Sequence, residues 1–427
     1  MKIIMNESLA EIQTRIRQQT EKTVDPNVEA RVTEIIQNVR ANGDAALIAY
    51  GQQFDGVELT TLKVSSADID AAVAQVEPAV LAALEKAAAN IASFHQLEVE
   101  ESFEDQPRPG VILGTKVTPL SAVGIYVPGG TAAYPSSVLM NAIPAKIAGV
   151  KQIIMVTPPQ KTGLNNAVLA AARIAGVDQI YQVGGAQAIA ALAYGTESIP
   201  QVDKITGPGN AYVATAKRDV YGQVDIDMIA GPSEIGILAD DSAKASEIAA
   251  DLLSQAEHDV NARAILITDS QQLAQAVSDE VETQLKTLPR QAIARPAIEN
   301  NGFIYVVDTI DEMFDLMNAV APEHLEIQLA NAYDYLAKIE NAGSVFLGRY
   351  ASEPLGDYLA GPNHILPTGG TARFSSALGV WDFQKRIQYL QYSSEALQAD
   401  AKDVTVLART EGLEAHARAI ESREDGL

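Results

Sequence analysis

Strand-like and helix-like segments alternate strictly along residues 117–222, and this alternation constrains the fold more than any other feature of the sequence. Short β-rich runs such as KQIIMVTP are followed by longer helical runs such as LNNAVLAAARIAGV. Such alternation requires crossover connections that keep the strands parallel and cover both faces of the sheet with helices. The segment is therefore predicted to form a doubly wound α/β lobe. Its strand ends carry glycines that mark sharp turns or close backbone approach, at Gly129-Gly130, Gly184-Gly185 and Gly207-Pro208-Gly209.

A second alternating region follows, with strands such as RAILIT and helices such as SQQLAQAVSDEVETQLKTL. Residues before 117 show apolar side chains mainly at helical spacing, and the chain after Trp381 is predicted to be helical and charged. We therefore expect four segments: a helical extension at 1–24, an α/β domain from 25–116 and 235–380, another from 117–234, and a helical tail at 381–427.

The composition restricts the class of protein. A chain of 427 residues is too long for one ordinary core, and 47% hydrophobic residues indicate a globular protein. Its 31 Lys and Arg stand against 55 Asp and Glu, and the formal charge of −24 disfavours nucleic acid and anionic membranes as partners. The apolar N-terminal stretch before Asn6 is too short for a signal peptide. No uncharged run reaches the roughly 18–20 apolar residues of a membrane helix. These features predict a cytoplasmic protein.

Four of the five histidines lie in distinctive settings in the last 170 residues, whereas His95 is predicted to be structural or solvated. Gln255 and His258 are three residues apart near the end of a predicted helix, so both side chains lie on one face. Imidazole is a natural zinc ligand, and this pair would supply two corners of a site. The alternative is a polar helix end exposed to water.

Two further histidines lie in the C-terminal part of the chain. His364 lies in EPLGDYLAGPNHILPTGGTARF, a loop rich in proline and glycine in which Asp357 offers an anionic oxygen. The alternative role for Asp357 is to cap a turn. His416 is predicted on a helix capped by Thr410, at the border of its apolar side, and a satisfied interface histidine is the alternative.

The remaining histidine, His324, lies directly after Glu323 in the sequence APEHL, and these two adjacent residues are candidate catalysts. Pro322 is predicted to end a helix, and HLEIQL alternates as a strand does. The pair therefore stands at the entrance of a strand, where side chains project into the crevice of a sheet. Two neighbouring titratable groups serve as different acid–base catalysts when their environments separate their pKa values. An exposed helix-to-strand turn is the alternative.

Taken together, these stretches resemble the histidinol dehydrogenase family, whose zinc enzymes oxidise L-histidinol through the aldehyde to L-histidine with two molecules of NAD. The resemblance extends from residue 42 to residue 419 in the family's order. Its most specific stretches are GIYVPGG, GGAQAIAALAYGT, DKITGPGNAYVATAKR, AGPSEI, LLSQAEHD, APEHLEI, GDYLAGPNHILPTGGTARFSS and EGLEAHARA.

The resemblance assigns roles to individual residues. It implies zinc ligands at Gln255, His258, Asp357 and His416, and an acid–base pair at Glu323 and His324. It implies that these zinc ligands and His324 also contact the substrate, together with Ser233, His364 and Glu411. It implies NAD contacts at Tyr126, Gln187 and Asn210. It further implies two Rossmann-like lobes, with NAD on 117–234, and an intertwined homodimer in which the tail brings Glu411 and His416 to the partner's site.

The residues add two points to the resemblance. The lobe at 117–234 lacks the G-x-G-x-x-G fingerprint, and KQIIMVTPP ends without the acidic residue that would bind a ribose hydroxyl. The chain also has no cysteine, so a thiolate cannot form the tetrahedral carbon from which an aldehyde is oxidised. The remaining route is a hydrated aldehyde, which needs one base to activate water and another to accept the hydroxyl proton. Glu323 and His324 fit these two roles.

Two other classes of function remain open at this point. A zinc hydrolase that uses Glu323 to activate water would share the ligands but would not need the glycine-punctuated lobe. A binding module without activity is the third possibility, because fold alone does not guarantee catalysis.

Overall fold

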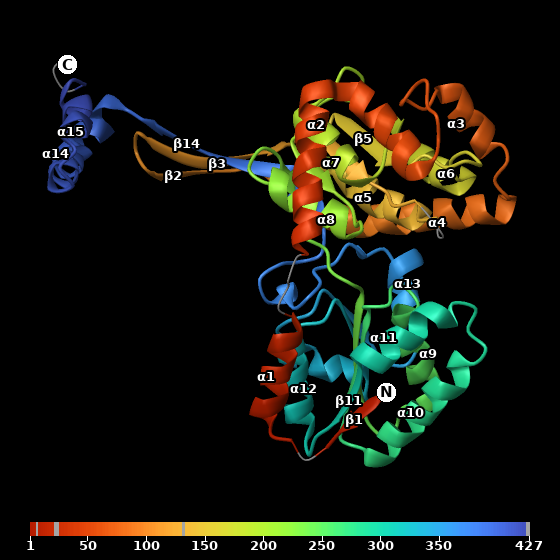
Figure 1. The fold of residues 1–427 in the computed structure, drawn as a ribbon. Coiled ribbons are helices and arrows are strands. Elements are labelled where there is room, and N and C mark those ends of the chain that lie inside the picture. Colours follow the sequence, from red (N-terminus) through yellow and green to blue (C-terminus); the bar gives the residue numbers. More distant parts are fainter. Residues whose placement is uncertain (6, 21–24, 130–132, 424–427) are drawn as a thin grey trace. The chain divides into compact units, whose positions relative to one another are not determined.

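The computed structural model describes residues 1–5, 7–20, 25–129 and 133–423 (Figure 1). The chain divides into two compact units. One contains residues 1–98 and 120–383, and the other contains residues 99–119 and 384–427. No helix in the described ranges is long and apolar enough to cross a membrane.

The first unit contains a six-stranded parallel sheet with the strand order β1-β11-β10-β9-β12-β13. Side chains of successive residues alternate between its two faces. Ala264 and Leu266 of β10 join a core with helices α9, α10 and α11, whereas Ile265 and Ile267 face α1 and α12. The strands are β1 (Lys2–Ile4), β9 (Glu234–Ala239), β10 (Arg263–Thr268), β11 (Gly302–Val306), β12 (His324–Gln328) and β13 (Ser344–Leu347). The helices are α1 (Leu9–Thr20), α9 (Ala245–Ala256), α10 (Gln271–Leu285), α11 (Gln291–Asn301) and α12 (Ile310–Val320).

The same unit contains a five-stranded parallel sheet with the order β6-β5-β4-β7-β8. Its two faces again bury separate cores, with Ile153 and Met155 of β5 on one side and Ile154 and Val156 on the other. Gly124 lets α7 approach β4 closely, since a Cβ there would lie 2.7 Å from Leu192. The strands are β4 (Ala122–Tyr126), β5 (Gln152–Thr157), β6 (Gln179–Gln182), β7 (Lys204–Thr206) and β8 (Asp225–Ile226). The helices are α2 (Pro26–Tyr50), α3 (Ser66–Val73), α4 (Pro78–His95), α5 (Pro135–Ile147), α6 (Asn166–Ala175), α7 (Gly185–Tyr194) and α8 (Ala211–Val220).

The short elements of this unit lie at turns and loops. After α2 the chain forms a π-helical turn, η1 (Gly51–Asp55), and after α4 a 3-10 turn, η2 (Gln96–Glu98). The loop beyond β13 contains the short helix α13 (Glu353–Tyr358). Further 3-10 turns are η3 (Ala332–Lys338), η4 (Thr371–Arg373) and η5 (Val380–Phe383).

The second unit is a three-stranded antiparallel sheet followed by two helices. Its strands are β2 (Phe103–Arg108), β3 (Val111–Pro119) and β14 (Gln384–Tyr392), and its helices are α14 (Ser394–Thr410) and α15 (Glu414–Glu421). All nine residues of β14 pair with β3. The two helices pack on one another.

The grouping of segments in the structure differs from the expected one at three places. Helices α2 and α4 pack against the five-stranded sheet, because their apolar stripes join its two cores. The sequence predicts instead that residues 25–116 belong to one domain with residues 235–380. The first residues form β1, which pairs with β11, so the N-terminus is not purely helical. The tail after Trp381, which the sequence predicts to be helical, contains the strand β14, whose residues are mostly exposed.

Candidate active site

Glu323 and His324 lie where α12 turns into β12, as the sequence predicted for this helix-to-strand boundary. Ala321 ends α12 in the left-handed conformation (φ 49°), and Pro322 prevents the helix from continuing. His324 is the first residue of β12 and pairs with Ile235 of β9 and Ser344 of β13. The pair therefore lies at the amino edge of the six-stranded sheet, not at the carboxyl edge where ligands of such sheets usually bind.

The backbone of Glu234 holds both side chains. Its N–H donates to Oε2 of Glu323 at 2.9 Å, and its carbonyl oxygen lies 3.0 Å from Nδ1 of His324. A carbonyl only accepts hydrogen bonds, so Nδ1 of His324 must carry the hydrogen. Nε2 is consequently the ring atom of His324 that exchanges a proton with a substrate. Both side chains are almost completely buried, with 9% of Glu323 and 4% of His324 exposed.

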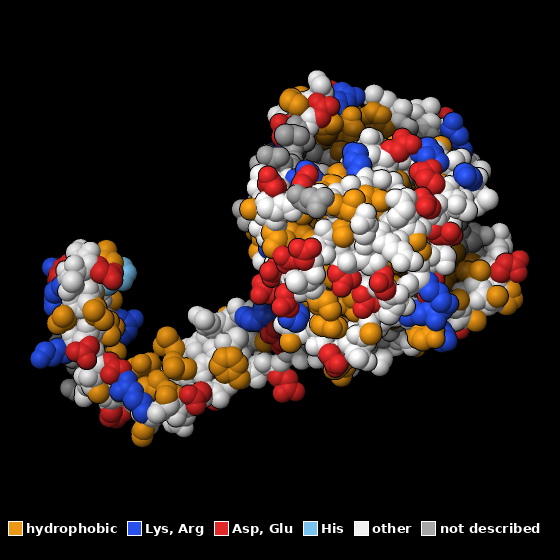
Figure 2. Space-filling model, turned by 90° about the horizontal axis from the view of Figure 1, so that it is seen from below, with side chains coloured by type: hydrophobic (Ala, Val, Ile, Leu, Met, Phe, Trp, Pro, Cys, Tyr) orange, Lys and Arg blue, Asp and Glu red, His pale blue; other side chains and the backbone are white. Residues whose placement is uncertain are grey.

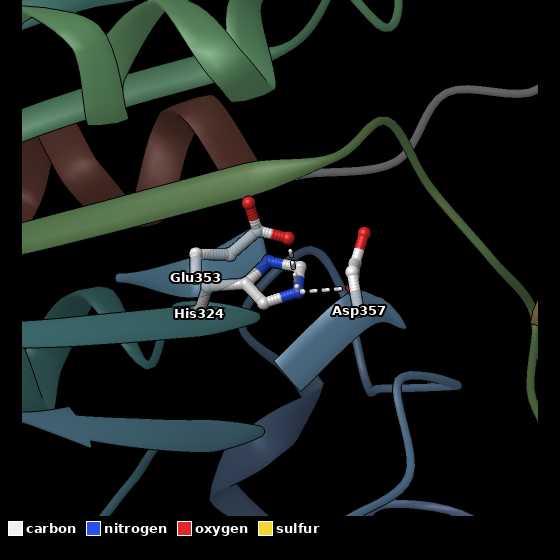
Figure 3. A group of neighbouring side chains, drawn as sticks. All are labelled: His324, Glu353 and Asp357. Carbon is white, nitrogen blue, oxygen red and sulfur yellow. Dashed lines mark ion pairs between the residues drawn. The ribbon is translucent and has the colours of Figure 1, made fainter. Parts of the chain in front are cut away.

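Nε2 of His324 faces two carboxylates on α13 (Figure 3). It lies 3.7 Å from Oε1 of Glu353 and 3.7 Å from Oδ1 of Asp357. The three residues form a cluster of groups that could hold a metal ion, with ligand atoms within 4.8 Å of one another. Nε2 of His324 and Oε1 of Glu353 are buried and have no hydrogen-bond partner among the described residues. Buried polar atoms of this kind can be satisfied by an ordered water, a substrate group or an ion.

The excess of carboxylates controls the protonation of this cluster. Burial raises the pKa of Glu323 to about 8, although the neighbouring His324 opposes the shift. Burial also raises the pKa of Glu353 to about 8, and the charge of Asp357 adds to the effect. Burial would lower the pKa of His324, but the charges of Glu323, Asp357 and Glu353 together raise it to about 10. Despite its burial, contact with His324 and His364 lowers the pKa of Asp357. A divalent cation would relieve this crowding of negative charge.

Gln255 and His258 approach the same cluster from the end of α9. Helix α9 ends at Ala256, and His258 lies in the following turn. The backbone N–H of His258 donates to the backbone carbonyl of Gln255 at 3.1 Å. His258 is solvent-exposed, yet partial desolvation of its ring lowers its pKa, while the charge of Asp357 raises it. Both polar atoms of the Gln255 amide are buried without a hydrogen-bond partner in the described part of the chain. The nearby amide only partly offsets the rise that burial causes in the pKa of Glu353.

His364 closes another side of the cluster. Its Nδ1 lies 3.0 Å from the carbonyl oxygen of Asp357 and 3.6 Å from the Oδ1 atom of that residue. Its Nε2 lies 3.2 Å from Oγ of Ser137 on α5. Burial lowers the pKa of the ring. Ser233 directly precedes β9 and is partly exposed.

Two predicted site residues, Glu411 and His416, lie in the second unit. Glu411 follows the last residue of α14, and His416 lies on α15; both are exposed. The predicted cap at Thr410 is wrong, because Thr410 ends α14 and its hydroxyl donates to the carbonyl of Val406 at 2.8 Å. His95, expected to be structural or solvated, is fully buried with Nδ1 2.7 Å from the carboxylate of Glu98.

A cavity of about 560 Å³ lies at the carboxyl ends of β4, β5 and β6. Tyr126, Gln187 and Asn210, the three residues predicted to contact a dinucleotide, all line it. The Tyr126 hydroxyl accepts the N–H of Gly185 at 3.0 Å. Gly185 has a φ of 64°, and a Cβ there would lie 2.7 Å from Oε1 of Gln187, so glycine is required for this arrangement. Asn210 caps α8 through its Oδ1, which leaves the amide nitrogen available.

The residues at both places fit the groups that the sequence predicted. Gln255, His258 and Asp357 offer amide, imidazole and carboxylate donors to a divalent metal, and the unpartnered amide of Gln255 lacks a ligand of that kind. The cavity has the size and lining of a cofactor site, and it lies at the strand ends where a dinucleotide binds an α/β sheet.

Sequence reasoning missed Glu353, Glu234 and Glu326. Glu353 could have been found, because it lies four residues before Asp357 and therefore on the same face of α13. Oε1 of Glu326 accepts the N–H of Glu353 at 2.8 Å and so fixes the start of that helix. Glu234 contributes through its backbone and through contacts with Arg263 at 2.7 Å and the N–H of Gly369 at 3.1 Å. No local pattern in the sequence signals the roles of Glu234 and Glu326.

Parallel α/β sheets, a ligand-sized cavity at the carboxyl ends of strands and a buried histidine among carboxylates are features of an α/β oxidoreductase. A sequence model of histidinol dehydrogenase matches residues 17–424, and the chain belongs to the histidinol dehydrogenase family. The histidinol dehydrogenase of Lactiplantibacillus plantarum is 66% identical, with 100% of this chain and 99% of the relative covered. That of Streptococcus mutans is 63% identical over 93% of each chain. The crystal structure of histidinol dehydrogenase from Elizabethkingia anophelis superimposes with a TM-score of 0.95 at 39% identity, covering 100% of this chain and 98% of that one.

The buried pair of Arg263 and Glu234 should be a sensitive point for stability. Replacing Arg263 by Met leaves the Glu234 carboxylate, which is 3% exposed, without its cation. We expect the free energy of unfolding, measured by urea denaturation, to fall by about 3–5 kcal/mol. The matched control is Arg349→Met, which breaks the solvent-exposed pair with Glu247 and should leave the free energy of unfolding nearly unchanged. Equal losses in the two variants would contradict the structural role of the buried pair.

Proposed function

We propose that this protein catalyses the four-electron oxidation of L-histidinol to L-histidine through L-histidinal, with a zinc ion and two molecules of NAD. The observation that carries the proposal is the juxtaposition of Glu323 and His324, two possible bases held by one residue, beside the donors Gln255, His258 and Asp357. Membership of the histidinol dehydrogenase family supports the choice of substrate. The strongly acidic composition and the sequence features described above support a cytoplasmic enzyme that acts on a small molecule.

The protein would hold the groups at separate places. Gln255, His258 and Asp357 would bind zinc together with His416 of a partner subunit, and Tyr126, Gln187 and Asn210 would bind NAD. When bound, zinc supplies a template that orients the imidazole and amine of the substrate, and NAD supplies the hydride acceptor. Ser233, His364 and Glu411 would contact the substrate around this template.

His324 would accept the hydroxyl proton in both oxidations. Its Nδ1 donates to the carbonyl of Glu234, so the proton from the substrate must arrive at Nε2. Each oxidation removes a hydride from the carbon and a proton from the hydroxyl oxygen on that carbon. The neighbouring carboxylates raise the pKa of His324 to about 10, and a zinc ion bound beside them would oppose this rise and favour the neutral ring, in which Nε2 is an acceptor. Once protonated, Nε2 faces the carboxylates of Glu353 and Asp357, which stabilise the cation.

Glu323 would activate the water that converts the aldehyde into its hydrate between the two oxidations. One of its oxygens accepts the N–H of Glu234, which fixes the carboxylate and leaves the other oxygen to take a proton from water. The hydrate again carries a hydroxyl group and a hydrogen on the same carbon, so the second oxidation repeats the chemistry of the first. Because the chain has no cysteine, hydration takes the place of a thiolate adduct.

We further propose that two copies form an intertwined homodimer in which the second unit of each chain completes the site of the other. Hydrophobic side chains are exposed along the extended strands of that unit (Figure 2). The exposed set comprises Phe103, Leu113, Ile387, Tyr389, Leu390 and Tyr392. Exposed apolar patches of this kind support a protein–protein interface. The tail carries Glu411 and His416, which the resemblance assigns to the partner's site.

The metal and the reaction are tested together in one experiment. The purified protein should contain zinc and should form NADH only when histidinol is added. His258→Asn should lower the zinc content and reduce turnover by about 100-fold or more, because the substrate loses its orienting template. Glu257→Gln is the control, since it changes the adjacent side chain without removing a proposed ligand. Full zinc and full activity in His258→Asn would refute the ligand assignment, and hydrolysis without NADH would indicate a zinc hydrolase.

The division of labour between Glu323 and His324 has a kinetic signature. Glu323→Gln keeps an oxygen that accepts the Glu234 N–H but cannot take a proton, so hydration should slow by about 10²- to 10⁴-fold. A single turnover should then give close to one NADH per site where the wild type gives two. His324→Asn is the contrasting variant and should slow both oxidations. If Glu323→Gln slows both hydride transfers equally and no aldehyde accumulates, the assignment of Glu323 as the base that activates water is wrong.

The shared site predicts complementation between two inactive variants. In a heterodimer of His416→Ala and Glu323→Ala chains, one site combines an intact Glu323 with an intact His416, and the other site carries both lesions. After subunit exchange in an equal mixture, about a quarter of the wild-type activity should return if chains pair at random. Activity is measured as NADH formation, and heterodimers are verified by distinct affinity tags. Verified heterodimers without activity would mean that each site is built within one chain.

A further inference from the structure

The cavity at the five-stranded sheet lacks an acidic residue at the position where dinucleotide-binding lobes usually carry one. In such lobes, a carboxylate that follows the second strand binds the hydroxyls of the adenosine ribose. Here the second strand is β5, which ends at Thr157 and continues through Pro158, Pro159 and Gln160 along the cavity wall. None of these side chains carries a negative charge. The ribose therefore has no acceptor of the usual kind from the strand that normally supplies it.

Asp55 brings a carboxylate into the same cavity from a different part of the chain. It is the last residue of the π-helical turn η1, and Gly56 ends this turn in the left-handed conformation (φ 65°). The preceding helix α2 packs on α7 and α8, two helices whose N-terminal ends border the cavity. Single π-helical turns occur frequently at functional sites. The position of Asp55 is thus fixed by helix packing, not by the strand order.

The carboxylate of Asp55 has no partner among the residues that the structure describes. It is partly buried, and it makes no ion pair and no hydrogen bond with any described residue. Burial without compensation raises its pKa to about 6. Its charge also acts on the buried Tyr126 hydroxyl at the cavity wall, whose pKa burial raises to about 12. A partly desolvated carboxylate is stabilised when a ligand donates hydrogen bonds to it, and a ribose diol provides two donors.

We propose that Asp55 binds the 2′- and 3′-hydroxyls of the adenosine ribose and thereby selects NAD over NADP. This assignment rests on the proposed use of a dinucleotide in this cavity. A 2′-phosphate would place negative charge against the carboxylate, which disfavours NADP. Removal of the carboxylate should therefore weaken NAD binding and relax discrimination against NADP at the same time.

The positive groups near Asp55 do not change this expectation. Arg31 lines the cavity, but its guanidinium is paired with Glu34 at 2.6 Å and lies 5.9 Å from the centre of the Phe54 ring. Lys161 lies beside the turn, with Nζ 3.2 Å from the position that a Cβ on Gly56 would occupy. These cations would attract a 2′-phosphate once the Asp55 charge is removed. They therefore strengthen the prediction that an Asp55 variant gains relative affinity for NADP.

Calorimetric titration of the zinc-loaded protein with three ligands tests the inference. The ligands are NAD, NAD lacking the adenosine 2′-hydroxyl, and NADP. Wild type should bind the deoxy analogue about 10- to 100-fold more weakly than NAD, the usual range for a hydrogen bond to a charged group. Asp55→Asn should bind NAD correspondingly more weakly, lose most of its discrimination against the deoxy analogue, and show a higher NADP-to-NAD affinity ratio. Glu58→Gln removes an exposed charge three residues away and should behave as wild type.

The outcomes separate this inference from the proposed function. If the wild type does not bind NAD at all, the proposed cofactor is wrong. If it binds NAD and the deoxy analogue equally well, the ribose role of Asp55 is overturned while the cofactor assignment stands, and this comparison needs no variant to fold. Suppose that Asp55→Asn retains the thermal unfolding profile of the wild type and prefers NAD over the deoxy analogue by the same factor as the wild type. Another group then binds the 2′-hydroxyl, and the inference is likewise overturned.

Discussion

The interaction on which the site depends is the pairing of β12 with β9, which begins where His324 aligns with Ile235. This pairing places the backbone of Glu234 against both Glu323 and His324, so one peptide segment donates to the carboxylate and accepts from the imidazole. Backbone groups of a buried parallel sheet cannot change rotamer, and this gives the two bases a fixed separation and a fixed tautomer. The buried ion pair with Arg263 also holds the side chain of Glu234 in place. Glu234 therefore contributes both to the stability of the fold and to the geometry of the two bases.

The second constraint is electrostatic. Three carboxylates, Glu323, Glu353 and Asp357, surround one imidazole in a largely buried space, and burial favours protonation of the two glutamates. Such a cluster is costly without a cation, since buried charges need partners. The proposed zinc ion would supply positive charge where Asp357 contributes a ligand and would release protons from the neighbouring groups. The acidity of the site would in this way favour the binding of the proposed metal ion.

The sequence was sufficient for the parts of the fold that repeat regularly and insufficient for the parts that depend on long-range packing. Alternation of strands and helices predicted parallel sheets, and Pro322 with HLEIQL predicted the boundary between α12 and β12. The grouping of α2 and α4 with the five-stranded sheet was not predictable, because an apolar stripe does not say which sheet it covers. The roles of Glu234 and Glu326 could not be predicted for a related reason. These residues act through hydrogen bonds to residues 89 and 27 positions away along the chain.

The register of β12 explains why adjacent residues can share one site although successive side chains of a strand point to opposite faces. His324 and Glu326 lie on one face of β12, where Glu326 holds the N-terminus of α13 and thereby places Glu353 and Asp357 opposite His324. Leu325 and Ile327 lie on the other face, in the core with α12. Glu323 precedes the ladder, so the turn set by Ala321 and Pro322 directs its side chain and strand alternation does not. A strand that began one residue earlier would fix Glu323 on the face of Leu325 and separate the two bases.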